Sequence, residues 1–347
     1  MRNHMKVTIA LISAIALIVS LIALSGCTKR YTTRLHVLPI AYGDALIIES
    51  NGVFGIVDSG ESWDYPDGSD PRYPAREGIT TGDGVDEMLF PLLDELGVSA
   101  QKGNLQFYIG THPHSDHIGT ASQVIEKYRP KYVYTPRYDD SMLPEDARWD
   151  NQYVYDRLIA AAHSTGATLI QDFDISADAF PQAGEDGTAV GNPTFPLGNA
   201  TVSILGFAKS ETMPEGGFAD ANDISYEVLF ENDKYRTFLA GDVVKYGPSE
   251  QIIAETVGKV DVLKLGHHGN DNAGSKDFIL ALSPEFAIQT GSEYALSGET
   301  TRALMDVKAK YYPTSEAADL KLKDLMFTYY NTGIEANMKP YELGQWG

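Results

Sequence analysis

Four side chains that can bind a metal ion lie within six residues of this chain. They are His112, His114, Asp116 and His117, in the run T-H-P-H-S-D-H-I-G. Divalent ions such as zinc bind imidazole nitrogens and carboxylate oxygens, and this run supplies both. The chain has only 8 histidines, and five of them fall in two clusters, this one and His267-His268. The two clusters therefore predict a metal centre.

Both clusters follow apolar segments that are typical of buried strands, at residues 105–110 and 260–265. Residues 121–128, just after the first cluster, have the pattern of a helix. A loop at the end of a strand combines a fixed position with access to solvent. We therefore expect the ligands to stand in strand-end loops.

The residue types predict how the ligands divide between two ions. His112 and His114 alternate along the chain, so both can point to one ion. Asp116 and His117 can hold a second ion. Two divalent ions a few ångströms apart generate hydroxide near neutral pH and bind the oxygens of a phosphoryl or acyl centre. The expected cofactor is one or two divalent ions, zinc first and manganese as the alternative.

Asp242 follows a predicted strand and is expected to bridge the two ions through its two carboxylate oxygens. One of His267 and His268 should complete the first site. His268 is the favoured ligand, which leaves His267 to contact the substrate or leaving group, and the sequence leaves this choice open. Asp116, Asp242 and His267 are the expected catalytic residues. Asp58 is expected behind the ligands, where it would orient an imidazole.

The N-terminus has the pattern of a targeting segment. Arg2 and Lys6 precede an apolar stretch over residues 7–24, and the ending L-S-G-C at Cys27 resembles a bacterial lipobox. The resemblance implies cleavage before Cys27 and lipid attachment there, and thus an extracytoplasmic protein anchored to the membrane. A membrane-spanning helix is the alternative. Cys27 is the only cysteine, so no disulfide can form within the chain.

Length and composition favour one large folded domain. The chain has 347 residues, 43% of them hydrophobic, and no repeat with a period of 20–50 residues. We expect a leader at 1–26, a tether at 27–33 and one hydrolase domain at 34–347. Removing the leader takes the formal net charge from −21 to −23. Such a charge disfavours nucleic acid as a partner.

The hydrophobic pattern predicts strands first and then alternating strands and helices, twice over. Strands are expected at 34–40, 44–50, 53–58, 105–110, 132–134, 200–206, 225–230, 235–240, 260–265, 285–290 and 325–331. Helices are expected at 86–96, 121–128, 153–164, 249–257, 275–282 and 299–310, and long loops at 61–80 and 136–150. This order favours an α/β fold, a four-layered αβ/βα sandwich of two mixed sheets with outer helices.

Six ordered motifs resemble the metallo-β-lactamase fold superfamily, specifically its ComEC-like branch. They are Y-G-D-A at 42–45, I-V-D-S-G at 56–60, H-x-H-x-D-H at 112–117, N-D-I-S at 222–225, L-A-G-D at 239–242 and L-K-L-G-H-H-G at 263–269. The resemblance covers residues 34–335. It implies the same sandwich fold and a metal-dependent hydrolase, in this branch one that cleaves phosphodiesters.

The chain departs from these relatives in two places. Many members of the superfamily have a histidine before the strand that leads to the bridging aspartate, whereas this chain has Asn222, as the ComEC-like branch does. We expect Asn222 behind the ligands. The branch also has a late His-Pro pair, which residues 292–297 (S-E-Y-A-L-S) lack. Water, Glu293 or Glu299 would have to substitute for that histidine, so occupancy of a second site is open.

The leading expectation for function is a phosphoester hydrolase. An alternative is a phosphorylcholine-type esterase, because the two long loops carry aromatic residues that could surround a quaternary ammonium group. These residues are Trp63, Tyr65, Tyr73, Tyr138, Trp149 and Tyr153. Packing within the loops is the simpler explanation for them. Hydrolysis of β-lactams and a non-catalytic metal-binding lipoprotein are the remaining alternatives.

Overall fold

The computed structural model describes residues 31–343, apart from 77–83, 208–216 and 246–248. The expected leader and Cys27 lie outside the described residues. Among the described helices, none is long and apolar enough to cross a membrane.

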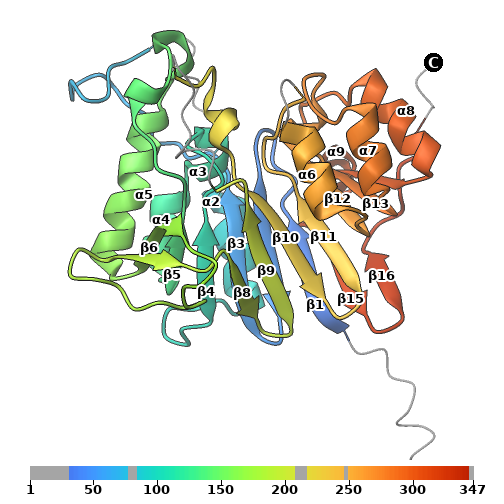
Figure 1. Ribbon diagram of the computed structural model, residues 1–347, viewed down its shortest axis with the longest axis horizontal. Coiled ribbons are helices and arrows are strands. Elements are labelled where there is room, and N and C mark those ends of the chain that lie inside the picture. The colour runs from blue at the N-terminus through green and yellow to red at the C-terminus, as the bar shows by residue number, and fades with distance from the viewer. Residues whose placement is uncertain (1–30, 77–83, 208–216, 246–248, 344–347) are drawn as a thin grey trace, which may run out of the picture.

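The described strands form two mixed sheets that lie face to face (Figure 1). In spatial order, the nine-stranded sheet contains β16 (Gly333–Ala336), β15 (Leu325–Tyr330), β1 (Tyr31–Val37), β2 (Ala45–Ser50), β3 (Val53–Ser59), β4 (Leu105–Ile109), β5 (Tyr132–Tyr134), β6 (Thr168–Phe173) and β7 (Thr188–Gly191). The seven-stranded sheet contains β14 (Lys310–Pro313), β13 (Phe286–Gln289), β12 (Val262–Lys264), β11 (Tyr235–Leu239), β10 (Glu227–Asn232), β9 (Ala200–Leu205) and β8 (Thr194–Leu197). Strands β3 to β7 run parallel to one another, and so do β11 to β14. The other neighbouring pairs, including β2 with β3 and β10 with β11, are antiparallel.

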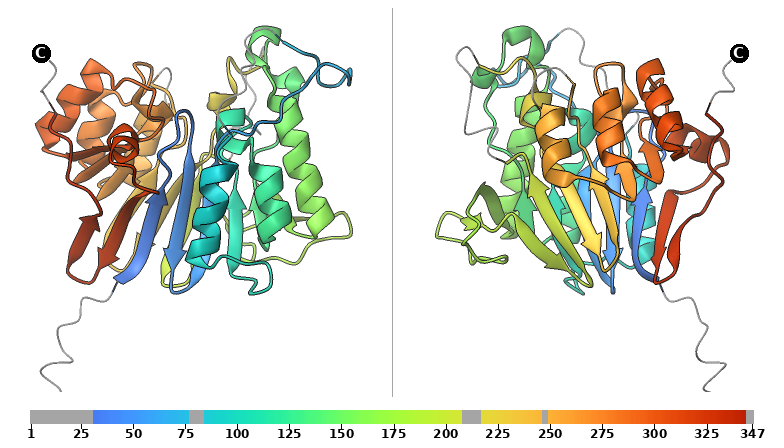
Figure 2. Two further views of the ribbon diagram at one scale, coloured as in Figure 1. Left: turned by 180° about the vertical axis from the view of Figure 1, so that it is seen from behind. Right: turned by 45° about the vertical axis from the view of Figure 1, so that its right-hand side comes forward.

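Helices cover the outer face of each sheet (Figure 2). The first sheet carries α2 (Asp86–Leu96), α3 (Ser115–Ile118), α4 (Ala121–Tyr128) and α5 (Asn151–Thr165). The second carries α6 (Ser249–Val257), α7 (Lys276–Leu282) and α8 (Gly298–Val307), with α9 (Thr314–Asp319) after β14. Short 3-10 turns are η1 (Asp140–Met142), η2 (Glu145–Ala147), η3 (Ala221–Ile224) and η4 (Gly266–Gly269). The four-layered αβ/βα sandwich expected from the sequence is confirmed.

Three hydrophobic layers hold this arrangement together. In β4, Phe107 and Ile109 point to the space between the sheets, and Leu105 and Tyr108 point to the helices; all four are fully buried. Successive residues of a strand face opposite sides, so a strand covered on both faces is apolar throughout. Burying one such side chain contributes about 1.5–3 kcal/mol.

The sequence pattern misplaced the last helix of the second sheet. A helix was expected at 299–310, but α8 ends at Val307, where Lys308 adopts a left-handed φ of 59°. The chain then enters β14, whose Tyr311 and Tyr312 are buried. Strands β6, β7, β8, β14 and β16 are not among the expected strands; each has four to six residues, too few for a clear period.

Candidate metal centre

The ligands expected from the sequence come together at the ends of β4, β11 and β12 and in α3, whose places in the fold Figure 1 shows. His112 and His114 lie in the loop after β4, and Asp116 and His117 lie in α3. Asp242 follows β11, and the His267-His268 pair follows β12 within η4. Both sheets therefore contribute to the centre.

One oxygen, Asp242 Oδ2, is the common point of the cluster. Four imidazole nitrogens surround it: His117 Nε2 at 3.2 Å, His268 Nε2 at 3.3 Å, His112 Nε2 at 3.9 Å and His267 Nε2 at 3.9 Å. The sequence analysis expected both carboxylate oxygens to bridge. Instead, Oδ1 faces the ammonium of Lys264 at 3.7 Å.

His117, His268 and Asp242 have the spacing of ligands of one ion, and Asp116 lies near two of them. His117 Nε2 lies 3.4 Å from His268 Nε2, and Asp116 Oδ2 lies 3.7 Å from His268 Nε2 and 4.0 Å from His117 Nε2. Bonds of about 2.0–2.2 Å in a tetrahedron place ligand atoms roughly 3.3–3.6 Å apart. This grouping differs from the sequence expectation, which placed His268 with His112 and His114.

His112 and His114 form the start of a second site. His112 Nε2 and His114 Nδ1 lie 3.0 Å apart, and His112 Nε2 also faces Asp242 Oδ2. His112 is fully buried and His114 nearly so. These two imidazoles and Asp242 supply three ligands.

Each of the five histidines has an oxygen on its other ring nitrogen. The pairs are His112 Nδ1 with Thr111 Oγ1 at 3.0 Å, His114 Nε2 with Asp220 Oδ1 at 3.5 Å, His117 Nδ1 with Asp58 Oδ2 at 2.8 Å, His268 Nδ1 with Thr290 Oγ1 at 3.1 Å and Asp44 Oδ1 at 3.3 Å, and His267 Nδ1 with Asn272 Oδ1 at 2.7 Å. Such partners fix the tautomer and ring orientation of a metal-binding histidine. Asp58 therefore stands where the sequence analysis expected it.

Asp44 was not assigned to the site from the sequence, although it lies in a noted motif. By distance alone, a carboxylate oxygen of Asp44 could bind a metal ion together with His117, Asp242 and His268. Its Oδ1, however, faces His268 Nδ1, whereas His268 Nε2 faces Asp242. The two nitrogens of an imidazole point in different directions. We therefore assign Asp44 to orienting His268 rather than to binding the ion.

Lys264 lies beneath the centre and is fully buried. Its ammonium forms an ion pair with Asp44 and donates a hydrogen bond to the carbonyl oxygen of Gly241 at 3.0 Å. Lys264 belongs to the motif L-K-L-G-H-H-G at 263–269, but the sequence alone predicted no role for it. A run of residues in one strand does not reveal which distant carboxylate a buried lysine meets.

The charges of the centre shift the pKa values of its histidines in opposite directions. Burial, together with the neighbouring His117 and His114, lowers the pKa of His112 well below its usual value. Burial also lowers the pKa of His117, but Asp242, Asp116 and Asp58 outweigh it and raise the value well above 6.5. The neutral form of His112 is the form that binds a metal ion.

The residues present fit divalent metal ions. Asp44, Asp58 and Asp242 are fully buried or nearly so, Asp116 is largely buried, and among the described residues Lys264 is the lysine that pairs with Asp44 and Asp242. Burial raises the pKa of Asp242, but His117 and His268 outweigh it and hold the value well below 3.8. Buried carboxylates need compensating positive charge. Imidazole nitrogens converging on a carboxylate oxygen are a ligand set suited to zinc.

Asn222 does not contact the ligand histidines in any described interaction. Its backbone N–H donates to Asp220 Oδ1 at 2.9 Å, and the same oxygen faces His114 Nε2. Asp220, which the sequence analysis did not single out, therefore holds the position behind His114. The late residues proposed as substitutes for a missing histidine do not approach the centre in the described contacts, since Glu299 pairs with Lys245 and the backbone of Glu293 binds Ala41.

Aromatic rings stand on two sides of the centre. Trp149, about half exposed, stacks on His114 with ring centroids 5.4 Å apart and an interplanar angle of 18°. Tyr294 stacks on His268 at 4.6 Å, and Tyr42 packs edge-on against Tyr294.

The six loop aromatics noted in the sequence do not form one cage. Tyr73 packs against Tyr153 and donates a hydrogen bond to Asp156, and Tyr138 is buried. Trp63 and Tyr65 are exposed, and Trp149 is the member of the six with a described contact to a ligand histidine.

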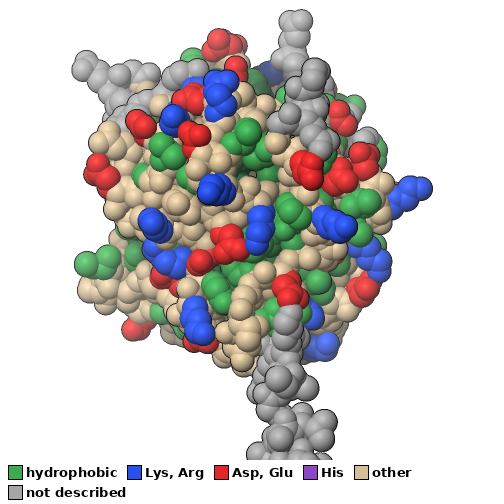
Figure 3. Space-filling model, turned by 90° about the vertical axis from the view of Figure 1, so that its right-hand side faces the viewer, with side chains coloured by type: hydrophobic (Ala, Val, Ile, Leu, Met, Phe, Trp, Pro, Cys, Tyr) green, Lys and Arg blue, Asp and Glu red, His purple; other side chains and the backbone are tan. Residues whose placement is uncertain are grey.

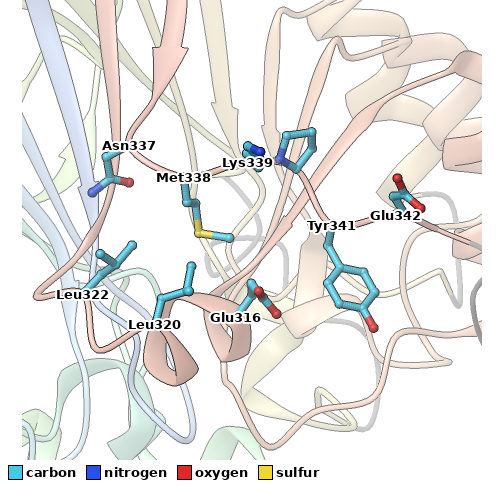
Figure 4. A pocket seen from close by; sticks show the side chains of 9 residues that line it. Glu316, Leu320, Leu322, Asn337, Met338, Lys339, Tyr341 and Glu342 are labelled. Atoms are coloured by element: carbon cyan, nitrogen blue, oxygen red, sulfur yellow. The ribbon is translucent and has the colours of Figure 1, made fainter.

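A surface hollow of about 610 Å³ lies elsewhere, between α9 and the segment after β16 (Figure 4). Leu320, Leu322 and Met338 line it together with Glu316 and Lys339. It shares no lining residue with the histidine cluster, so we do not assign the metal chemistry to it.

Fold and site together define the class of protein. The chain has the metallo-β-lactamase fold, as shown by two mixed sheets with outer helices and by ligands at the strand ends in the order expected from the sequence. The fold carries a candidate metal site. No protein-family model matches the chain.

Two curated proteins are similar in sequence. ComE operon protein 3 of Bacillus subtilis (strain 168) is 24% identical over 259 residues, which are 74% of this chain and 28% of that protein. Recombination protein 2 of Haemophilus influenzae is 37% identical over 67 residues, 19% of this chain and 8% of that protein. The chain thus spans about a quarter or less of each relative, and the first similarity agrees with a ComEC-like branch.

Solved structures of similar fold include the metallo-beta-lactamase fold protein YhfI from Bacillus subtilis, with 13% identity, a TM-score of 0.43 and coverage of 85% of this chain and 99% of that one. Igni18, a metallo hydrolase from the archaeon Ignicoccus hospitalis, has 14% identity, a TM-score of 0.39 and coverage of 81% and 94%.

Proposed function

We propose that this chain is a metal-dependent hydrolase of phosphoesters, with phosphodiesters as the favoured substrates. The observation that carries the proposal is the set of four imidazole nitrogens around Asp242 Oδ2. Each of these imidazoles has an oxygen beside its other ring nitrogen. Divalent ions at such a centre supply a water of lowered pKa and neutralise charge on a phosphoryl group. This chemistry does not require a serine or cysteine nucleophile.

The residues of the chain orient and enclose the reacting groups. Asp58 and Asp44 hold His117 and His268 in one tautomer, so their Nε2 lone pairs face Asp242. Burial of the histidines keeps the local dielectric low, which strengthens each charge interaction at the centre. Trp149 covers the side of His114 and offers an apolar face to the group attached to the phosphate.

Asp242→Ala should abolish catalysis with little loss of folding. The change removes the one oxygen that faces four imidazoles, so at least one ion should be lost, and turnover of bis-p-nitrophenyl phosphate should fall by several orders of magnitude. The strand before it, ending in Phe238 and Leu239, packs without the carboxylate. Turnover and bound metal are to be measured together, before and after chelation.

His163→Ala is the matched control. His163 is exposed on α5, and we expect this variant to keep both metal content and turnover. If Asp242→Ala retained turnover near that of His163→Ala, the assigned centre would not be the catalytic one. If the metal-loaded wild type were inactive on phosphodiesters but cleaved a β-lactam or a phosphomonoester, the proposed substrate class would be wrong. The cleaved compound would then indicate the correct class.

Nucleic acid is a less favoured substrate than a small phosphodiester. The formal net charge of −21 opposes the approach of a polyanion. The face shown in Figure 3 has basic side chains scattered among acidic ones and no continuous basic groove. A groove elsewhere would be needed for tight binding of a nucleic acid backbone.

A phosphorylcholine-type esterase is the second candidate, favoured by Trp149. Its half-exposed ring beside His114 could bind a quaternary ammonium group by cation–π attraction, which contributes about 0.5–2 kcal/mol. Comparing p-nitrophenyl phosphorylcholine with bis-p-nitrophenyl phosphate in wild type and Trp149→Ala tests it. A selective rise in KM for the choline ester supports this candidate, and equal effects on both substrates contradict it.

We also propose that the protein is anchored outside the cytoplasmic membrane by a lipid on Cys27. The support is the lipobox-like sequence at residues 24–27. In that case the substrates would be extracytoplasmic phosphoesters, such as those of the cell envelope.

A further inference from the structure

The site begun by His112 and His114 has a fourth position with no side chain assigned so far. His112 Nε2, His114 Nδ1 and Asp242 Oδ2 supply three donor atoms. A structural zinc site has four protein ligands, whereas a catalytic one has three and a water, so the fourth ligand is either a water or a further side chain. Asn222, which lies where relatives have a histidine, makes no described contact with these imidazoles.

His267 is the side chain placed to complete the site. Its Nε2 lies 3.9 Å from Asp242 Oδ2, the same distance as His112 Nε2. Two ligands of one ion can be at most about 4.2 Å apart when each bond is about 2.1 Å, so the spacing is compatible with a shared ion. Burial is the main cause that lowers the pKa of His112, and His267 adds to it, which is consistent with the two rings lying near each other.

The hydrogen bond behind His267 sets which of its nitrogens is free. Asn272 Oδ1 lies 2.7 Å from His267 Nδ1, and an amide oxygen can only accept. His267 Nδ1 therefore carries the proton, and the lone pair is on Nε2, the nitrogen that faces Asp242. A neutral imidazole held in this tautomer presents its lone pair on Nε2 and is suited to bind a metal ion.

The backbone of η4 is bent to aim both neighbouring histidines at the centre. His267 and His268 have φ values of 42° and 56°, in the left-handed region that non-glycine residues seldom adopt. Two consecutive residues in this conformation persist only where the surroundings impose it. Here the His267 N–H binds the carbonyl oxygen of Gly241, next to Asp242.

We propose that His267 binds the same ion as His112 and His114, through Nε2, and completes that site. This replaces the expectation that His267 contacts the substrate or leaving group. The inference rests on the metal centre of the proposed function but not on its substrate. The chain would then carry two ions that share Asp242 Oδ2: one with Asp116, His117 and His268, and one with the other three histidines.

His267→Ala and His267→Cys in the full chain test the proposal. Metal-replete wild type should retain two ions per chain by elemental analysis after desalting, and His267→Ala should retain one. His267→Cys, loaded with cobalt, should show a thiolate-to-cobalt charge-transfer band in the near ultraviolet. Wild type gives the baseline, because Cys27 is its only thiol. His163→Ala is the control and should retain two ions.

Asn272→Leu provides a variant that keeps the imidazole. Loss of the acceptor behind Nδ1 should weaken binding of the second ion by roughly 10–100-fold, as found when such partners are removed. Folding of every variant is checked by circular dichroism, and Asn272→Leu decides the matter if His267→Ala does not fold.

Two ions in His267→Ala with unchanged affinity, or no charge-transfer band in His267→Cys, would overturn the assignment. One ion in metal-replete wild type would also overturn it. A protein that binds two ions yet cleaves no phosphodiester would contradict the proposed function and leave this ligand assignment intact.

Discussion

At the scale of single residues, the centre depends on side chains that bind no ion themselves. Asp44 faces His268, Asp58 faces His117, and Lys264 compensates the charge of Asp44 from a fully buried position. Burial alone would lower the pKa of Lys264, but the carboxylates of Asp44 and Asp242 raise it. The lysine is therefore a permanent cation of the interior.

Lys264→Met should destabilise the metal-free protein by about 3–5 kcal/mol, because it leaves the carboxylate of Asp44 buried without its partner. Lys264→Met with Asp44→Asn should regain part of this loss, since the double variant has neither charge. Urea unfolding of the metal-free variants measures both effects. A double variant as unstable as the sum of the two single variants would show that the pair does not interact.

At the scale of elements, close approach of two loops shapes the centre. Gly43 has a φ of 82°, and a Cβ atom built there would lie 1.7 Å from the backbone oxygen of Asp116. The N–H of Asp44 donates to that same oxygen at 3.2 Å. The loop before β2 thus packs directly on α3, and a side chain at Gly43 would push the metal-binding loop away.

Gly43→Ala and Gly52→Ala form a matched pair. Gly52 has a φ of 79° with open space around its Cβ position, so its replacement should cost only the left-handed conformation, about 1–2 kcal/mol. Gly43→Ala should cost more and should also weaken the ion bound near Asp116. Thermal unfolding and metal titration measure the difference; equal losses for both variants would argue against contact between the loops.

His36 in β1 pairs through charge with Glu49 in β2 and with Asp324, the residue just before β15. Its Nδ1 lies 2.7 Å from Asp324 Oδ2, and its Nε2 lies 3.6 Å from Glu49 Oε2. Burial lowers the pKa of His36, but the two carboxylates raise it above 6.5 overall. A raised pKa stabilises the fold fully below the unfolded value and loses this contribution as the pH rises through the folded value.

His36→Gln should therefore destabilise the protein more at about pH 5.5 than at about pH 8.5. Comparing the variant with wild type at each pH cancels the titration of the other groups. Urea unfolding of both metal-free proteins supplies the measurement. A difference that stays constant or grows with pH would contradict the ion pairs of His36.

Local patterns in the sequence predicted the layers well, and they pointed to candidate ligands that the structure brings together, because strand period and ligand spacing are properties of neighbouring residues. They could not predict contacts between distant segments. Asp220 reaches His114 across more than 100 positions, and Lys264 meets Asp44 across more than 200. The grouping of His268 with His117 depends on which strand ends meet, which is decided by the packing of the two sheets.

At the scale of the whole molecule, the sequence predicts an anchored domain with an acidic surface. The described helices include none able to cross a membrane. The predicted attachment point is Cys27, which lies just before the described residues. The candidate metal centre stands at the ends of strands from both sheets.

Cys27→Ser should leave the chain uncleaved before residue 27 and without lipid, because its thiol is the attachment point. Wild type should partition into detergent and show a lipid-modified N-terminus by mass spectrometry. Retention of residues 7–24 in an unmodified wild type would show that a membrane helix anchors the protein instead.

The division of the ligands between two sheets also affects the order in which the molecule can assemble. Residues 112–117 come from one sheet and residues 242–268 from the other, so the candidate ligands come together only after the sheets have packed. During synthesis, a chain that has reached residue 240 still lacks Asp242 and both later histidines. Capture of an ion by the proposed centre would thus be a late event, and a bound ion would join the two halves of the molecule as a crosslink does.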